Sequence, residues 1–456
     1  MRATHVIVAV SVLAALLASP TAAQLPDEAS VAGKCMTCHK EKHPGLYQQW
    51  YESAHGEHNV TCISCHKAEA GEPDAYEHYD ATIATLVTPK DCGRCHAKES
   101  EQVSNSYHAS AGQILDSKDA YLAHVAAGEP AAIQGCESCH GGKVEIDPDS
   151  PNKLSAKSWP NSGIGRINPD GSLGSCNACH TRHSFSIAQA RQPEACSKCH
   201  LGPDHPQKEI YEESKHGNAY YTNVDKMNLD ADKWVVGEDY NVAPTCATCH
   251  MSATRTQEFT HNVGDRISWT LRPIVSTYKD NHVENRQAMK DVCVACHGDT
   301  FANGHFYQFD ASVKLYNEKF AKPAKAIIEK IREKKLLENP ASFSNEIEWS
   351  FWELWHHEGR RARHGAAMMG PDYTWWHGFY DIAHNFYFEF LPQAEEFEDP
   401  DVDALIEELI LSDPMHQWIG TDTSALKQRI KSGEMQELFA DMFDTYVEAE
   451  AASSGH

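Results

Sequence analysis

Cysteine and histidine occur together in this chain in one repeated pattern. Each of the sixteen cysteines belongs to a Cys-x-x-Cys-His motif, in which a histidine directly follows the second cysteine. Two such thiols can attach to the two vinyl groups of a haem, and the histidine can bind its iron. The cysteine pairs are Cys35 and Cys38, Cys62 and Cys65, Cys92 and Cys95, Cys136 and Cys139, Cys176 and Cys179, Cys196 and Cys199, Cys246 and Cys249, and Cys293 and Cys296.

Zinc sites and disulfides are the alternative uses of so many cysteines. Zinc needs paired cysteines but no histidine after every pair, and disulfides need neither the spacing nor the histidine. Covalent haem needs all three residues together. The pattern therefore predicts eight covalently bound c-type haems with iron, and these proximal iron ligands: His39, His66, His96, His140, His180, His200, His250 and His297.

The short spacing of the motifs restricts the fold. Successive motifs begin only 20 to 50 residues apart, which is too short for eight separate haem domains. The haems must therefore lie close together, with the polypeptide wrapped around them. Breaks at Gly, Pro, Asn and Asp are frequent in this region, and long alternating β-branched runs are absent. We expect loops and short helices, in a mainly α multihaem cytochrome c fold with little sheet.

After residue 300 the chain contains no cysteine, and apolar residues recur there at helical spacing. The predicted helices cover residues 312–338, 346–369, 379–391, 403–411 and 425–448. Pro323 is expected to kink the first of them. The predicted organisation is thus a signal peptide at residues 1–23, a haem-binding region at 24–300 and a helical region at 301–456.

The first 23 residues have the features of a secretory signal peptide. Arg2 supplies a positive end, an apolar stretch follows, and Thr21-Ala22-Ala23 offers a small-residue cleavage site. A membrane anchor is the alternative, but the apolar stretch is short for a membrane span. We therefore expect an exported, periplasmic and soluble protein that keeps no membrane anchor after the signal is removed.

The charge of the chain indicates which partners it can bind. It has 65 acidic and 40 basic residues, a formal net charge of −25. This balance excludes nucleic-acid binding through a general basic surface. It favours a basic redox partner, such as a small cationic cytochrome, which the acidic surface would attract.

Several stretches resemble one known family. The chain reads CNACHTRHSFS, RQPEACSKCH, GPDHPQ and ESKHG between Cys176 and His216, and later APTCATCHM, THN and CVACH followed by Phe301-Ala302. With its eight motifs in order, it resembles the octahaem hydroxylamine oxidoreductases as far as about Tyr380. The resemblance implies a catalytic haem at the fourth motif, with His140 as its only histidine ligand. It implies that seven further histidines are the distal ligands of the other haems: His55, His78, His108, His183, His216, His261 and His364. His124 is the alternative to His108.

The resemblance also implies the residues of the catalytic pocket. Asp204 and His205 correspond to a distal acid–base pair that moves protons. Tyr373, in GPDYTWWHG, falls where the family has a tyrosine that bonds to the catalytic haem of a neighbouring subunit, which implies a homotrimer. Arg272 stands where the family often has a distal tyrosine, and a guanidinium there would bind an anion such as nitrite. The alternatives are a loop end, an ordinary buried tyrosine and a salt-bridged arginine.

Three functions are compatible with these residues. The first expectation is an oxidoreductase of nitrogen metabolism that oxidises hydroxylamine or hydrazine and passes the electrons along seven bis-histidine haems. The alternative is reduction of nitrite or hydroxylamine towards ammonia through the same haems, which Arg272 favours. A pure electron-transfer cytochrome is the third, and the Asp204–His205 pair argues against it.

Overall fold

The computed structural model describes residues 30–443, so the expected signal peptide lies outside the described residues. The chain divides into two compact units. The first extends to Val87 and includes Thr181–Phe185, and the second contains Thr88–His180 and all residues from Ser186 onwards. Within residues 30–443, no helix has the length and apolar character needed to cross a membrane.

The first unit consists of short helices and one hairpin, and it carries the first two haem motifs. Ser30 begins the first helix, where its hydroxyl accepts a hydrogen bond from the main chain of Gly33 at 3.0 Å. The second motif forms a helix by itself. The elements are α1 (Val31–Lys42), α2 (Pro44–Tyr51), α3 (Ala54–Glu57), α4 (Cys62–His66), and the antiparallel strands β1 (Tyr76–His78) and β2 (Ala81–Ile83).

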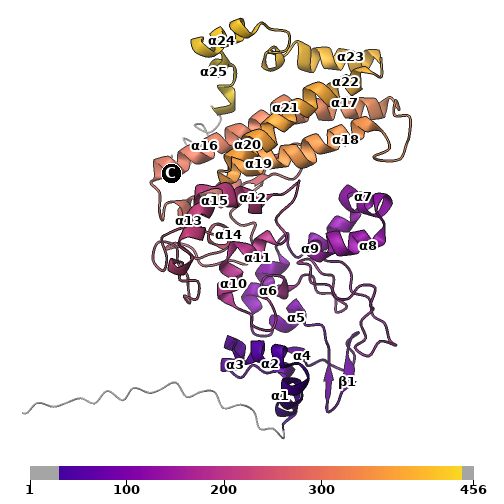
Figure 1. The fold of residues 1–456 in the computed structure, drawn as a ribbon, viewed down its shortest axis with the longest axis vertical. Coiled ribbons are helices and arrows are strands. Elements are labelled where there is room, and N and C mark those ends of the chain that lie inside the picture. Colours follow the sequence, from indigo (N-terminus) through magenta and orange to yellow (C-terminus); the bar gives the residue numbers. More distant parts are fainter. Residues whose placement is uncertain (1–29, 444–456) are drawn as a thin grey trace, which may run out of the picture. The chain divides into compact units, whose positions relative to one another are not determined.

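The second unit begins with a region of short helices and loops that carries the other six motifs (Figure 1). Its only regular sheet among the described residues is the antiparallel pair β3 (Trp269–Thr270) and β4 (Thr277–Tyr278). The helices are α5 (Pro89–Cys92), α6 (Ala97–Ser104), η1 (Ala111–Asp116), α7 (Lys118–Ala126), α8 (Glu129–Ala132), η2 (Ile133–Glu137), α9 (Ser138–His140), η3 (Cys176–Ala178), α10 (Ile187–Arg191), α11 (Pro193–Ser197), α12 (Gln207–Glu213), α13 (Lys215–Thr222), η4 (Val224–Lys226), α14 (Cys246–His250) and α15 (His282–Cys293).

The end of the second unit consists of long helices that pack on one another (Figure 1). Their core includes the fully buried Ile327, Leu354 and Phe386. The helical runs are α16 (Asp299–Tyr316), η5 (Asn317–Ala321) and α17 (Lys322–Glu333); α18 (Glu346–Trp352), η6 (Glu353–Glu358) and α19 (Gly359–Met368); α20 (Pro371–Thr374), η7 (Trp375–Tyr380), α21 (Asp381–Asn385), η8 (Phe386–Phe390) and α22 (Leu391–Glu395); and α23 (Pro400–Ile406), η9 (Glu407–Leu411) and the short η10 (Pro414–His416). The prediction of a mainly α fold with little sheet is confirmed.

The predicted helices differ most from the structure in two places. The helix expected at residues 312–338 begins at Asp299, and it passes Pro323 through the π-helical turn η5, which adjusts the backbone just before the proline. The helix expected at residues 425–448 is two helices, α24 (Thr423–Ser432) and α25 (Glu434–Leu438). Gly433 separates them because its φ of 88° cannot continue a helix. Residues after 443 lie outside the described range.

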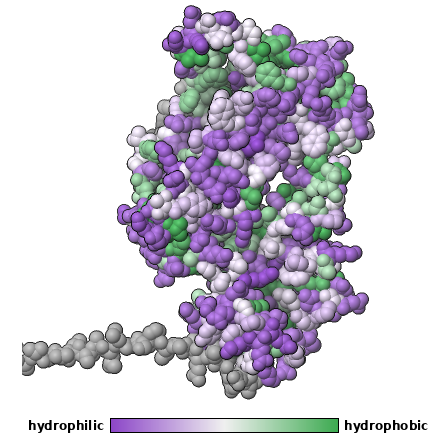
Figure 2. Space-filling view, in the orientation of Figure 1, coloured by the Kyte–Doolittle hydropathy of each residue, from purple (hydrophilic) through white to green (hydrophobic). Residues whose placement is uncertain are grey.

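Hydrophilic side chains cover most of the face that Figure 2 shows. Among the helices beneath the surface, however, Glu358 is buried, and Asn385 donates a hydrogen bond to its carboxyl at 3.2 Å. Burial raises the pKa of Glu358 to about 8. The folded protein therefore holds this carboxyl protonated at pH values where the unfolded chain has lost the proton.

Replacing Glu358 with Gln is expected to raise the melting temperature at pH 8.5 but not at pH 5. A raised folded-state pKa contributes stability that is lost as pH rises from the unfolded pKa to about 8. The neutral amide does not lose it, so we expect a gain of roughly 2–4 °C for each kcal/mol recovered. Calorimetry at both pH values measures this, with Glu434→Gln as an exposed control. Equal shifts at the two pH values would contradict the expectation.

Candidate haem centres and active site

Histidine rings lie in pairs at the separation that one haem iron requires. An imidazole nitrogen binds a metal at about 2.0 Å and lies about 1.1 Å from the centre of its ring, so the centres of two rings on one iron are about 6.2 Å apart. Four motif histidines have a predicted distal histidine near this separation between ring centres. The pairs are His39 and His78 at 6.3 Å, His66 and His183 at 6.4 Å, His180 and His261 at 6.3 Å, and His297 and His216 at 6.1 Å.

The sixth motif has two candidate partners. The ring of His200 lies 6.1 Å from that of His108 and also 6.1 Å from that of His205. Burial lowers the pKa of His200 to about 3, and the charges of the other two rings contribute. This keeps the imidazole neutral, which is the form that binds iron. The predicted roles are compatible with this arrangement if His108 is the ligand and His205 faces the neighbouring site.

The remaining predicted distal histidines lie in different surroundings. His55 packs edge-on against Phe185, with ring centres 5.1 Å apart, within the first unit. His364 lies on α19, and its Nδ1 is buried with no hydrogen-bond partner. Burial lowers its pKa well below the usual value, assisted by the charges of Arg363 and Arg360. A buried imidazole nitrogen without a partner fits a metal ligand.

Several motif histidines are oriented by main-chain carbonyl groups. His66 Nδ1 donates to the carbonyl of Ala84 at 2.8 Å, and His250 Nδ1 donates to that of Val263 at 3.3 Å. The main chain of Ala111 makes such a bond with His140. A proximal histidine that donates one ring N–H in this way has its other nitrogen fixed for iron.

The cysteines also fit haem attachment. Among the described residues, none of the sixteen forms a disulfide. Cysteines from different motifs come within hydrogen-bonding contact, so the attachment points of different haems adjoin one another. These contacts join Cys92 to Cys176, Cys139 to Cys199, and Cys196 to Cys246. Cysteines outside disulfides, paired rings and unpartnered ring nitrogens together fit covalently bound haems that pack closely.

Replacing His78 with Ala is expected to convert one low-spin haem to a high-spin haem. The change removes the ring that faces His39 and leaves that iron without its second histidine. EPR spectra of the oxidised protein, with haem content quantified, measure this. His58→Ala is the matched control in the same unit, because that ring is exposed and bonds only to the carbonyl of Ala54 in its own helix. An unchanged high-spin signal in the first variant would contradict the pairing.

His140 lines a cavity of about 250 Å³ in the second unit, and Arg272 lines the same cavity. The other lining residues are Tyr107, Ser110, Ala111, Gln113 and Ile114. Burial lowers the pKa of His140, and the positive charges of His205 and Arg272 contribute. The predicted proximal ligand, acid–base histidine and arginine therefore lie near one another.

Closely packed glycines hold the main chain around His140. The main-chain N–H of Gly165 donates to the carbonyl of His140 at 3.0 Å. A Cβ on Gly163 would collide with the main chain of Gly141, and one on Gly165 would collide with the main chain of Gly112. Only glycine allows these segments to approach so closely.

Asp204 and His205, the predicted acid–base pair, contact each other, and an arginine that we did not predict contacts Asp204. His205 Nε2 lies 3.6 Å from Asp204 Oδ1, and Arg360 Nη1 donates to Asp204 Oδ2 at 2.9 Å. Arg360 Nε donates to the main-chain carbonyl of Arg272 at 3.1 Å, and its guanidinium lies over the ring of Trp355 at 5.3 Å. The largely buried Arg360 side chain thus positions both Asp204 and the Arg272 backbone. Arg360 stands one helical turn before His364, and this spacing was the signal in the sequence that could have placed it near the site.

Tyr373 lies on α20, where its main-chain N–H donates to Glu213 at 3.3 Å. Its ring is half-buried, with its centre 5.2 Å from that of His377. Trp375, Trp376 and Tyr380, which follow it, are exposed. The bond that the resemblance implies between Tyr373 and a neighbouring subunit involves a second chain, so it stays a prediction.

The fold and these centres define a multihaem c-type cytochrome. Residues 171–342 match the family described as "Seven times multi-haem cytochrome CxxCH". More particularly, the chain is similar in sequence to a protein named for hydroxylamine oxidoreductase. One relative is a probable nitrite reductase-hydroxylamine oxidoreductase fusion protein of Kuenenia stuttgartiensis, 25% identical over 371 residues. The match covers 67% of this chain but only 38% of that relative.

Two solved structures share the fold. A hypothetical multiheme protein is 25% identical, with a TM-score of 0.71, and the match covers 85% of this chain and 97% of that one. A reducing HAO-like protein complex of Kuenenia stuttgartiensis is 21% identical, with a TM-score of 0.61 and coverage of 80% and 85%. The second likeness concerns the fold alone.

Proposed function

We propose that this protein reduces nitrite, and hydroxylamine, towards ammonia at the haem held by Cys136, Cys139 and His140. The observation that carries the proposal is that Arg272 lines the cavity of His140. A guanidinium attracts a small planar anion and orients it by charge-assisted hydrogen bonds. The relative from Kuenenia stuttgartiensis is named as a probable fusion of nitrite reductase and hydroxylamine oxidoreductase, and this name supports a nitrogen substrate.

The residues of the pocket divide the work of this reaction. A bound haem would supply electrons and an iron that accepts the nitrogen ligand. Arg272 binds and orients the anion. His205 delivers protons, and Asp204 holds its ring through the 3.6 Å contact. Arg360 keeps Asp204 in place and balances its charge.

We propose eight haems in all. The seven besides that of His140 would conduct the electrons. Their seven irons, with two histidines each, would be low-spin electron carriers. We also propose that the protein works as an exported, periplasmic enzyme. The net charge of −25 favours a small basic cytochrome as electron donor.

Oxidation of hydroxylamine or hydrazine is the second candidate function. Tyr373 favours it, because the exposed aromatic side chains that follow offer a face for a second chain in a homotrimer. A haem crosslink at Tyr373 would change the mass of its tryptic peptide. Detection of the crosslinked peptide would support the oxidative direction.

Steady-state kinetics tests the main proposal. The holoprotein is given reduced viologen as electron donor and nitrite as substrate, and ammonia is quantified. We expect nitrite-dependent oxidation of the viologen with ammonia as product. Oxidation of hydroxylamine without any nitrite turnover would overturn the reductive proposal.

A further inference from the structure

A second carboxylate–imidazole pair lies in the second unit, besides Asp204 and His205. His356 Nε2, on η6, lies 2.9 Å from Asp119 Oδ1, on α7. The side chain of His356 is only 3% exposed, whereas that of Asp119 is 32% exposed. The pair therefore extends from the protein interior to a carboxylate that solvent reaches.

Aromatic side chains fix the orientation of His356. The ring of Trp352 stacks on it with centres 4.0 Å apart and an interplanar angle of 16°, and the ring of Trp355 meets it edge-on at 5.1 Å. A buried imidazole is costly unless its nitrogens find polar partners. Between these two indoles, Asp119 is the carboxylate that lies against the His356 ring.

His357 and Arg360 link this pair to the catalytic pocket. The ring centre of His357 lies 5.2 Å from that of His356. The charges of both Asp119 and Asp204 act on His357, so this ring lies near both carboxylates. Arg360 binds Asp204 directly, and its charge also acts on Asp119. The charged groups around the His356–His357 pair thus include Asp119 from α7, Asp204 from its loop, and Arg360 and Arg361 from the same helical run. Lys118 lies on α7 beside Asp119.

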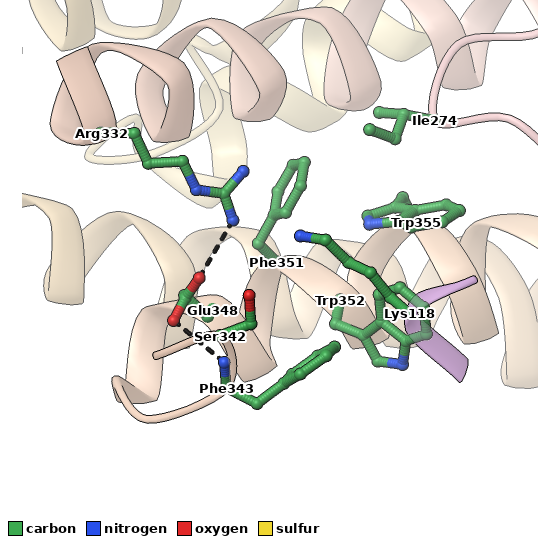
Figure 3. A pocket seen from close by; sticks show the side chains of 9 residues that line it. All are labelled: Lys118, Ile274, Arg332, Ser342, Phe343, Glu348, Phe351, Trp352 and Trp355. Atoms are coloured by element: carbon green, nitrogen blue, oxygen red, sulfur yellow. Dashed lines mark hydrogen bonds and ion pairs between the residues drawn. The ribbon is translucent and has the colours of Figure 1, made fainter. Parts of the chain in front are cut away.

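A separate cavity lies beside the two indoles that hold His356. Figure 3 shows Trp352 and Trp355 in its wall together with Lys118, the residue before Asp119. The cavity has a volume of about 110 Å³, enough for several water molecules. The indoles that hold His356 therefore separate the buried ring from a space that can contain water.

We propose that Asp119 and His356 form the outer end of a proton path that serves the pocket of His140, with Asp204 and His205 at its inner end. A proton from water binds Asp119, moves to His356 and continues by way of His357 to Asp204 and His205. This inference rests on the proposed function, since reduction of nitrite takes up protons together with electrons. The path carries protons only, and the electrons come from the other haems.

The charges of the path suit this role. Burial favours the protonated form of Asp119, but the close contact with His356 and the charges of His356 and Arg360 outweigh it and lower its pKa. Asp119 is therefore a carboxylate at neutral pH and can accept a proton. Burial lowers the pKa of His357 to about 4, so its ring stays neutral between the carboxylates.

Proton uptake on reduction, measured without substrate, tests the path. The holoprotein is reduced in a stopped-flow instrument while a pH-indicating dye reports proton uptake and absorbance reports the high-spin haem. We expect proton uptake linked to that haem to be at least about tenfold slower in Asp119→Asn and in His356→Gln. Asp119→Glu, which keeps the carboxylate, should retain most of the rate. Asp401→Asn is the control, because this exposed carboxylate pairs with Lys334.

The outcomes separate the path from the proposed function. Uptake at the unaltered rate in both Asp119→Asn and His356→Gln would overturn the path even if nitrite is reduced. Slow uptake in Asp119→Asn, restored in Asp119→Glu, would support the path even if the protein reduced no nitrite. Asp119 is partly exposed, so its variants test the path even if His356→Gln fails to fold.

Discussion

Replacing Arg272 with Met is expected to lower kcat/KM for nitrite by about 100- to 1000-fold. The substitution removes the guanidinium from the cavity of His140 but keeps much of the side-chain length. Nitrite is an anion, and in the variant it loses both the attraction and the charge-assisted hydrogen bonds. Hydroxylamine is neutral near pH 7, so its turnover should fall much less. Initial rates with reduced viologen and each substrate give the comparison.

A second variant of Arg272 and a control at Arg255 sharpen this result. Arg272→Lys keeps the charge without the planar fork and should recover part of the nitrite activity. Arg255→Met is the matched control, because the side chain of Arg255 is 74% exposed and pairs with Glu238. Equal losses for nitrite and hydroxylamine in Arg272→Met would show that the arginine acts on structure and not on the anion.

Replacing His205 with Asn is expected to lower kcat by about 100- to 10,000-fold with a small change in KM. The imidazole is the group of the Asp204–His205 pair that we propose as the proton donor to the bound substrate. Asparagine keeps a polar side chain of similar size but cannot carry a proton. Because Arg272 still binds the anion, substrate affinity should persist. Steady-state kinetics over a range of pH separates kcat from KM.

The control for His205→Asn is His384→Asn. The side chain of His384 is 57% exposed and lies beside Glu389. EPR of the variant also shows whether the haem of His200 changes its spin state, because His205 lies 6.1 Å from His200 between ring centres. Loss of a low-spin signal would show that His205 is an iron ligand, which would contradict its role as proton donor.

The haem attachments were predictable because each motif is contiguous. Cys136, Cys139 and His140 stand within five residues, so local spacing alone identifies them. Distal ligands are different, because folding brings together residues that no short motif connects. His180 and His261 are an example, and only the family resemblance suggested His261.

Residues that act through tertiary contacts were beyond prediction from the sequence. Arg360 is far along the chain from Asp204, and Asp119 is far from His356, so no periodicity joins either pair. The helices after residue 300 were predictable from their apolar spacing. The π-helical turn before Pro323 and the break at Gly433 depend on local backbone geometry that periodicity does not report.

EPR of the oxidised holoprotein, with haem quantified, tests most directly the central claim that one iron of eight, that of His140, is open to substrate. We expect eight haems per chain, with one high-spin signal against seven low-spin haems. Added nitrite should change the high-spin signal alone, and Arg272→Met should weaken that change. Eight low-spin haems that do not respond to nitrite would contradict the claim.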